Sequence, residues 1–236
     1  MFEFSLVMVP VITLLIPIIA LTVYCYVKDQ GWKAVLWGCL SMIVTIYLVR
    51  MVLPLMVLNT EWFVSLMANP VPYSAVYSLC FSIVYLLLSW LSLRFLVKPK
   101  TPEQGLTFGF CQGMAYVGMF ISFPALSALL SDINVTIGTA GSAGLWFSIA
   151  EAVMIELYLA IGGWMIEKFI LEKKYGYLVG AFVLFGLVLE WGLLASILVF
   201  SRIWGLLVLF VGLVALICGF RSKLPLKTLF TQDENE

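Results

Sequence analysis

Four charged residues stand inside long apolar runs of this 236-residue chain, and their chemistry is the first guide to function. They are Arg50, Glu151, Glu156 and Glu190. A charged side chain in the hydrocarbon core of a membrane costs about 2.5–3.5 kcal/mol on insertion scales, so it persists where it is paired or lines a cavity. A carboxyl group in apolar surroundings can also escape this penalty by taking up a proton. These four residues are therefore candidates for an intramembrane polar site.

The spacing of these residues leaves two interpretations open. Glu151 and Glu156 are five residues apart, so they project about 140° apart on one helix and need not face one cavity. Arg50 lies in the outer half of its apolar run and is expected to pair with one carboxylate, a contact that would merely join helices. The alternative is a site for a substrate, an ion or a proton, because two of the three carboxylates lack an obvious partner.

A second group of candidates lies in the run GLTFGFCQGMAYVG, residues 105–118. Gln112 and Tyr116 are four residues apart, so they share one face of a helix. Glycines also recur every four residues, which is typical of faces through which membrane helices approach closely: Gly105, Gly109 and Gly113. We expect either a tight contact with an interhelical hydrogen bond, or what remains of a ligand site.

The composition excludes several classes of protein. Hydrophobic residues make up 63% of the chain and charged residues 11%, against roughly 25% charged in ordinary soluble domains. The 13 Lys and Arg residues balance 13 Asp and Glu residues. These values exclude a soluble globular enzyme, a disordered chain and a nucleic-acid binder with a basic face.

The chain also lacks the residues that usually bind metals or support nucleophilic catalysis. Histidine is absent, which removes the commonest metal ligand and proton shuttle. The five cysteines lie in or beside apolar runs without a CxxC pair, and we interpret them as small apolar fillers. We predict no catalytic residue, since no Ser–His, Cys–His or aspartyl pair is present. We also predict no metal and no other cofactor.

These side chains must be positioned by membrane-spanning helices, each of which needs about 20 mostly apolar residues. We predict an all-α fold, a polytopic membrane helix bundle of about seven transmembrane helices. The first span is too long for a signal peptide and is preceded by Glu3, so it should remain as a helix that Pro10 and Pro17 kink. The predicted spans are residues 4–27, 34–58, 73–97, 105–130, 144–166, 177–200 and 203–220.

The basic residues predict the orientation of this bundle. With seven spans, every Lys and Arg except Arg50 and Arg202 falls on one side. The positive-inside rule places that side in the cytoplasm, so we expect the N-terminus outside the plasma membrane and the C-terminus inside. Residues 1–223 then form a single membrane domain and 224–236 a short polar cytoplasmic tail. The connectors 98–104 and 167–176 are expected to be cytoplasmic.

Two runs resemble parts of the YhfC-type family of intramembrane metalloproteases. One is GWKAVLWGCLSMIVTIYLVRMVLPL, residues 31–55, with its central Arg50. The other is GFCQGMAYV, residues 109–117, which is similar to a family run G-x-G-H-G-G-I-E-A and places Gln112 at the His and Tyr116 at the Glu. Phe185 stands at the His position of the sixth span, Glu190 lies beside its acidic position, and the fifth-span His falls near Glu156.

The resemblance implies a related helical fold but not proteolysis. A tetrahedral zinc site with His ligands cannot be built here, although Glu151, Glu156 and Glu190 could hold a hard cation. The chain therefore resembles a degenerate member, a pseudoprotease. The function this implies is that of a non-catalytic subunit or regulator that binds another membrane protein or a hydrophobic peptide.

Two other functions remain open at this stage. The first is a transporter, or a subunit that binds a small molecule or ion through the buried Arg and Glu residues. No internal repeat is visible, which weighs against an inverted-repeat carrier. The second is an active enzyme of another kind, with a buried Glu as general base.

Overall fold

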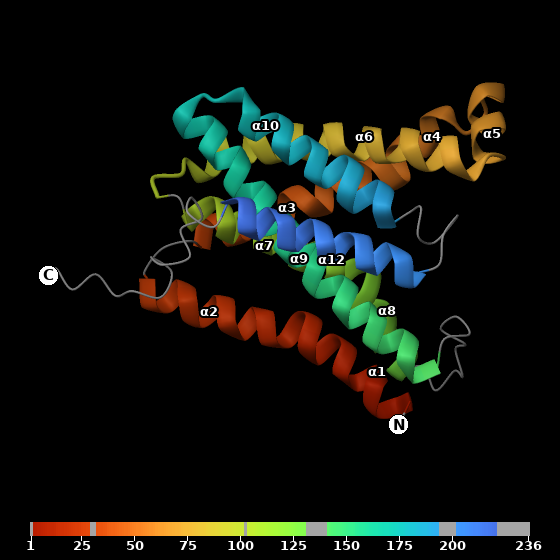
Figure 1. Ribbon diagram of the computed structural model, residues 1–236, viewed down its shortest axis with the longest axis horizontal. Coiled ribbons are helices and arrows are strands. Elements are labelled where there is room, and N and C mark those ends of the chain that lie inside the picture. Colours follow the sequence, from red (N-terminus) through yellow and green to blue (C-terminus); the bar gives the residue numbers. More distant parts are fainter. Residues whose placement is uncertain (1, 29–31, 102, 131–140, 194–201, 221–236) are drawn as a thin grey trace, which may run out of the picture.

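The computed structural model describes residues 2–28, 32–101, 103–130, 141–193 and 202–220, and nearly all of them are helical. Long helices run side by side and alternate in direction, so that they form one bundle (Figure 1). Within these residues, six helices have the length and apolar composition that a membrane crossing requires. The all-α prediction is thereby confirmed, and the arrangement is that of a multi-pass membrane protein.

Most of the long helices consist of consecutive segments, because α-helical stretches (α) are followed by π-helical stretches (η). In chain order the segments are α1 (Phe2–Pro10), η1 (Val11–Leu15), α2 (Ile16–Lys28), α3 (Trp32–Tyr47), η2 (Leu48–Val52), α4 (Leu53–Val57), α5 (Glu61–Met67), α6 (Pro70–Leu91), η3 (Ser92–Val97), α7 (Glu103–Val117), η4 (Gly118–Ser122), α8 (Phe123–Leu130), α9 (Gly141–Glu172), α10 (Tyr175–Phe182), η5 (Val183–Glu190) and α12 (Arg202–Phe220).

Three of the π-helical segments have a common cause in the sequence. Pro17, Pro54 and Pro124 each stand two residues after the end of η1, η2 and η4. A proline cannot donate a backbone hydrogen bond, and its ring clashes with the carbonyl four residues earlier. The preceding turn widens to accommodate it, and such π-helical turns are frequent at functional sites. The kink expected at Pro17 is thus a π-helical turn.

The predicted spans agree with the structure where hydropathy alone sets the boundary. The first four begin and end within three residues of the observed apolar helices. The end of the fifth span was wrong, because α9 continues from residue 166 to Glu172. The expected ten-residue connector is therefore only the pair Lys173 and Lys174, and Lys173 ends the helix with a positive φ of 55°.

The last two spans and one short helix complete this comparison. Residues 194–200 of the predicted sixth span lie outside the described residues, as does the predicted tail. The seventh span corresponds to α12, which is apolar after Arg202. Helix α5 was not predicted from the sequence. It begins where the Thr60 hydroxyl accepts a hydrogen bond from the backbone N–H of Phe63.

The closest helix packing in the bundle is between α7 and α9. A Cβ atom at Gly109 would overlap the carbonyl oxygen of Leu159, and one at Gly163 would overlap the carbonyl oxygen of Gly105. A Cβ at Gly113 would lie 2.6 Å from the Cα of Glu156. The glycines at four-residue spacing therefore form the close contact that their pattern predicted. Helix α9 also contacts α1, α10 and α12 and lies at the centre of the bundle.

One end of the bundle carries the short basic connectors. Helix α2 ends and α3 begins there, η3 ends and α7 begins there, and α9 ends and α10 begins there (Figure 1). Glu172 forms ion pairs at 3.0 Å with both Lys168 and Lys174, and the hydrogen bond to Glu172 raises the pKa of Lys174. We call this the basic end; α5 and the start of α6 lie at the opposite end (Figure 1).

Candidate functional site

Arg50 is the cation of the candidate site, and it stacks on an aromatic ring. The carbon of its guanidinium lies 3.7 Å from the centre of the Phe120 ring and 6.0 Å from that of Tyr77. An arginine over an aromatic face is attracted by the ring quadrupole, more strongly where water is excluded. The side chain is nevertheless exposed on the surface of the bundle, so the edge of the guanidinium remains accessible.

Glu190 supplies a carboxyl group near Arg50. Its side chain is buried at 1% exposure, it interacts with the Tyr116 hydroxyl, and it lies within electrostatic range of Arg50. The direct ion pair expected from the sequence is not formed: the ion pairs within 4.0 Å in the described residues are those of Glu172. Arg50 stacks on Phe120 instead.

Two polar atoms in this group have no hydrogen-bond partner among the described residues. They are Oε1 of Glu190 and the hydroxyl of Tyr77, which lies in the field of both Arg50 and Glu190. Buried polar groups are almost always paired, so two orphans beside an exposed cation form an unusual concentration of unused hydrogen-bonding capacity. We call Arg50, Tyr77, Tyr116, Phe120 and Glu190 the Arg50 cluster.

The Arg50 cluster is assembled largely by π-helical segments. Arg50 lies on η2, Phe120 on η4 and Glu190 on η5, while Tyr77 comes from α6 and Tyr116 from α7. Arg50 is seven residues from the end of α4, and Tyr77 is seven residues from the start of α6. At about 1.5 Å per residue, both lie about 10 Å from the end of the bundle opposite the basic end.

Gln112 points to a different set of neighbours. It is fully buried, and its Nε2 donates to the Ser41 hydroxyl at 2.9 Å and to the Ser89 hydroxyl at 2.8 Å. These serines lie on α3 and α6, so the amide joins three helices. This is the interhelical hydrogen bond that the sequence analysis offered as one interpretation of Gln112, although Oε1 of the amide has no partner in the described residues.

Glu151 and Glu156 lie on α9. Both side chains are buried, because other helices surround α9. Their side chains are 8% and 4% exposed. The backbone and side chain of Glu156 pack directly against Gly113 of α7, and its Oε1 has no hydrogen-bond partner among the described residues. Of the six candidate residues, the structure therefore groups Arg50, Tyr116 and Glu190, and it places Gln112 and Glu156 in other contacts.

Aromatic rings, those of Tyr116 and Phe185, stand at two of the positions that the family resemblance assigns to the metal site. Phe185 stacks on Tyr85 with ring centres 3.9 Å apart and an interplanar angle of 16°. Phe81 lies between the two assigned positions, 5.6 Å from Phe185 and 6.3 Å from Tyr116. All four rings are buried. These residues do not fit a zinc ion, because the rings occupy the volume and offer neither nitrogen nor thiolate donors.

One buried carboxylate, that of Glu167, lies where the sequence predicts a connector. Glu167 was assigned to a connector, yet it is fully buried and its Oε2 accepts a hydrogen bond of 3.0 Å from the backbone N–H of Gly105. Gly105 lies in the first turn of α7, so Glu167 satisfies one of the free N–H groups there. The sequence offers no signal for this, because Lys168 directly follows Glu167 and the two read as the start of a polar connector.

The partners of Arg50 were missed as well. Tyr77 and Phe120 carry no charge and lie in apolar runs, where aromatic residues are common. Cys39 and Cys111 also proved to be neighbours, since the thiol of Cys39 donates to the Cys111 carbonyl at 3.5 Å. In each case the contact joins different helices, and spacing along one helix cannot reveal it.

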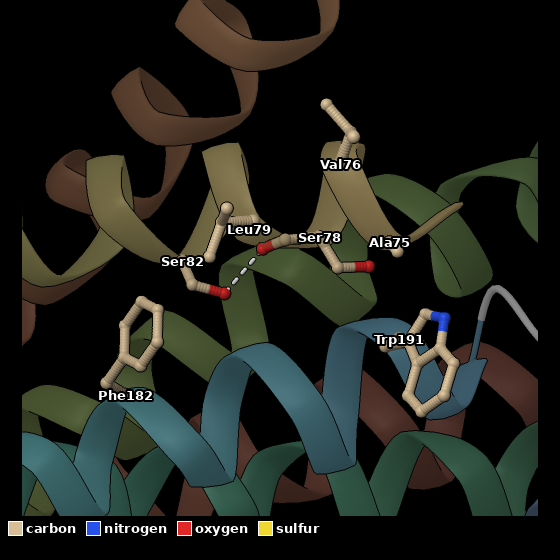
Figure 2. Close-up of a pocket in the computed structure, with 7 residues that line it drawn as sticks. All are labelled: Ala75, Val76, Ser78, Leu79, Ser82, Phe182 and Trp191. Carbon is tan, nitrogen blue, oxygen red and sulfur yellow. Dashed lines mark hydrogen bonds between the residues drawn. The ribbon is translucent and has the colours of Figure 1, made fainter. Parts of the chain in front are cut away.

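A groove of about 320 Å³ lies between α6 and the helix formed by α10 and η5. Phe182 and Trp191 stand at its two ends, and the Ser82 hydroxyl donates to the Ser78 carbonyl at 2.5 Å along its floor (Figure 2). Leu79 is 48% exposed, so the groove opens toward the surroundings of the bundle. The lining consists of Ala75, Val76, Ser78, Leu79, Ser82, Phe182 and Trp191.

Comparison of the chain with family models, with curated proteins and with solved structures found no match.

Proposed function

We propose that this chain is a non-catalytic membrane subunit, related to the intramembrane metalloproteases that its sequence resembles. In this role it binds another membrane protein or a hydrophobic peptide. The observation that carries the proposal is the packing of Phe81, Tyr85, Tyr116 and Phe185. Four buried rings stabilise the bundle where a protease of this kind would need metal ligands and an open space for substrate.

The groove between α6 and the helix formed by α10 and η5 is the contact surface we propose for the bound segment. One turn of helix, about 10 Å across and 5.4 Å high, fills roughly 420 Å³, which exceeds the 320 Å³ of the groove. The groove therefore accepts side chains of a partner helix rather than the helix itself. Small residues on its floor, Ala75 and Ser78, permit the close approach that membrane helices need.

Purification from native membranes in mild detergent tests this proposal. We expect a membrane protein or peptide to copurify in a fixed ratio, and Ala75→Phe to reduce its recovery severalfold because the new ring fills the groove. Leu87→Phe is the matched control, since Leu87 lies on α6 with 54% exposure but does not line the groove. Recovery of the chain alone, or equal losses in both variants, would argue against the proposal.

The Arg50 cluster favours a second function, that of a transporter or of a subunit that binds a small molecule or an ion. Its support is an exposed cation beside two polar atoms without partners. Glu190→Gln should then abolish uptake or binding while leaving recovery of a protein partner intact. Glu156→Gln tests whether the carboxyl on α9 belongs to the same function. Unchanged uptake in both variants would contradict it.

A further inference from the structure

The hydrogen-bonding groups of the Arg50 cluster indicate the chemical class of a ligand, which neither proposed function specifies. Arg50 has one face on Phe120 and is exposed, so N–H groups at its edge can reach a ligand. No carboxylate oxygen within the described residues lies within 4.0 Å of it. A guanidinium with a free edge is suited to a carboxylate or a phosphate, which it binds through two parallel hydrogen bonds.

The carboxyl group of the cluster offers an acceptor without a partner. Glu190 is 99% buried, and its Oε1 accepts no hydrogen bond in the described part of the chain. A primary ammonium group can donate to such an oxygen, and the rings of Tyr77 and Tyr116 would attract the same positive charge. The orphan hydroxyl of Tyr77 lies in the field of both charges and can bond to either end of a ligand.

We propose that the Arg50 cluster binds a zwitterion, with an anionic group on Arg50 and a primary ammonium group on Glu190. The inference deepens the second proposed function, because it names the ligand class of the same cluster. It also explains why Arg50 and Glu190 lie near each other without direct contact, since the ligand would bridge them. Two sources share this chemistry: a phosphatidylethanolamine headgroup and a free phosphoethanolamine-like zwitterion.

The position of the cluster makes both sources accessible. Arg50 is exposed and lies about 10 Å inside the end of the bundle opposite the basic end. This is the depth at which a long arginine side chain can reach the headgroup region of a bilayer. A lipid can therefore place its phosphate on Arg50 from the side, and a soluble zwitterion can enter from the adjacent end.

Titration of the purified full-length protein in mixed micelles tests the proposal. The probes are phosphatidylethanolamine, phosphatidylcholine, phosphatidylglycerol and soluble phosphoethanolamine. We expect phosphatidylethanolamine to bind at least about tenfold more tightly than the other two lipids, because neither of those carries a primary ammonium. If phosphoethanolamine displaces it at a comparable Kd, the ligand is a free zwitterion; if it does not, the ligand is the lipid.

Variants separate this site from general lipid binding. Arg50→Gln and Glu190→Gln should each weaken phosphatidylethanolamine binding about tenfold or more, and Arg50→Lys should restore part of it. Arg94→Gln is the matched control, because Arg94 is also exposed and lies over aromatic rings, Trp90 and Phe95, at 5.1 and 5.5 Å. It should leave the Kd unchanged.

Three results would overturn the proposal. They are equal binding of phosphatidylglycerol, an equal loss in Arg94→Gln, and unchanged binding in Glu190→Gln. The melting temperature of each variant is measured without ligand, so that a loss of fold is recognised. Tyr77→Phe removes only the hydroxyl group, and its Kd for phosphatidylethanolamine provides a second test of the site. Uptake is not measured, so a failure of the transport proposal and a failure of this one remain distinguishable.

Discussion

At the scale of single residues, the chain tolerates an intramembrane cation by spreading its stabilisation over several groups. Arg50 stacks on Phe120, lies near Tyr77 and is attracted by Glu190 at longer range. A contact ion pair in the interior would require both charged groups to lose their hydration. The free-energy cost of this desolvation often cancels the electrostatic attraction between them. Stacking on the Phe120 ring leaves the edge of the guanidinium accessible, whereas a direct ion pair with a carboxylate would occupy it.

We predict measurable coupling between Arg50 and Phe120. Arg50→Leu and Phe120→Leu, alone and together, form a double-mutant cycle of the free energy of unfolding. At a centroid distance of 3.7 Å the interaction energy should be about 0.5–2 kcal/mol. The Arg94 and Trp90 pair, at 5.1 Å, is the control and should give a smaller value. Additive effects of the two substitutions would show that the ring does not stabilise the cation.

The sequence predicts the members of the site better than their grouping. Arg50 and Glu190 are conspicuous because charge is rare in apolar runs, and the structure brings them into one cluster with Tyr116. Gln112 shares a helix face with Tyr116 but bonds to Ser41 and Ser89. The reason is physical: periodicity determines which face a residue occupies, whereas the neighbours of that face come from other helices.

At the scale of elements, proline and glycine determine how the helices approach one another. Pro54 and Pro124 follow the π-helical segments that carry Arg50 and Phe120. The glycines of α7 bring it so close to α9 that no side chain fits between them. Without a hydrophobic driving force between helices in lipid, such close packing supplies much of the stability of the bundle.

We predict that Gly109→Ala destabilises the protein by about 1–3 kcal/mol, because the new methyl group would overlap the backbone of Leu159 and force α7 and α9 apart. Gly176→Ala is the control, since nothing lies within 4 Å of the position of its Cβ on α10. The measurement is the melting temperature in one detergent. A similar change in both variants would mean that the α7–α9 contact is not critical.

Hydropathy predicts the helices well where a polar boundary follows an apolar run, as in the first four spans. It fails at the end of α9, because Glu167 reads as the start of a polar connector. In the structure that carboxylate is fully buried and satisfies the N–H of Gly105, so the helix continues past it. A polar residue marks a boundary only if it has no partner inside the protein, and a single sequence does not reveal the partner.

At the scale of the whole molecule, charge is divided between the two ends of the bundle. Lys33, Lys98, Lys100 and the group from Lys168 to Lys174 belong to helix ends or connectors at the basic end. The Arg50 cluster lies toward the opposite end. A ligand that enters there meets Arg50 rather than these basic connectors, which favours recognition of a compact zwitterion over attraction of any anion.

This division of charge also predicts the orientation in the membrane. Reporter fusions should place the C-terminus in the cytoplasm, and a tag inserted between Leu58 and Thr60, ahead of α5, should be accessible from outside, since basic connectors are retained inside. The tag also bears on the ligand site, because it marks the end nearer to Arg50 and thus the leaflet that would supply a headgroup. A cytoplasmic tag together with an external C-terminus would invert the bundle and place the Arg50 cluster toward the inner leaflet.

Double replacement of Lys98 and Lys100 by Gln is the control for charge, and a shift toward mixed orientation would show that these lysines help to set the topology.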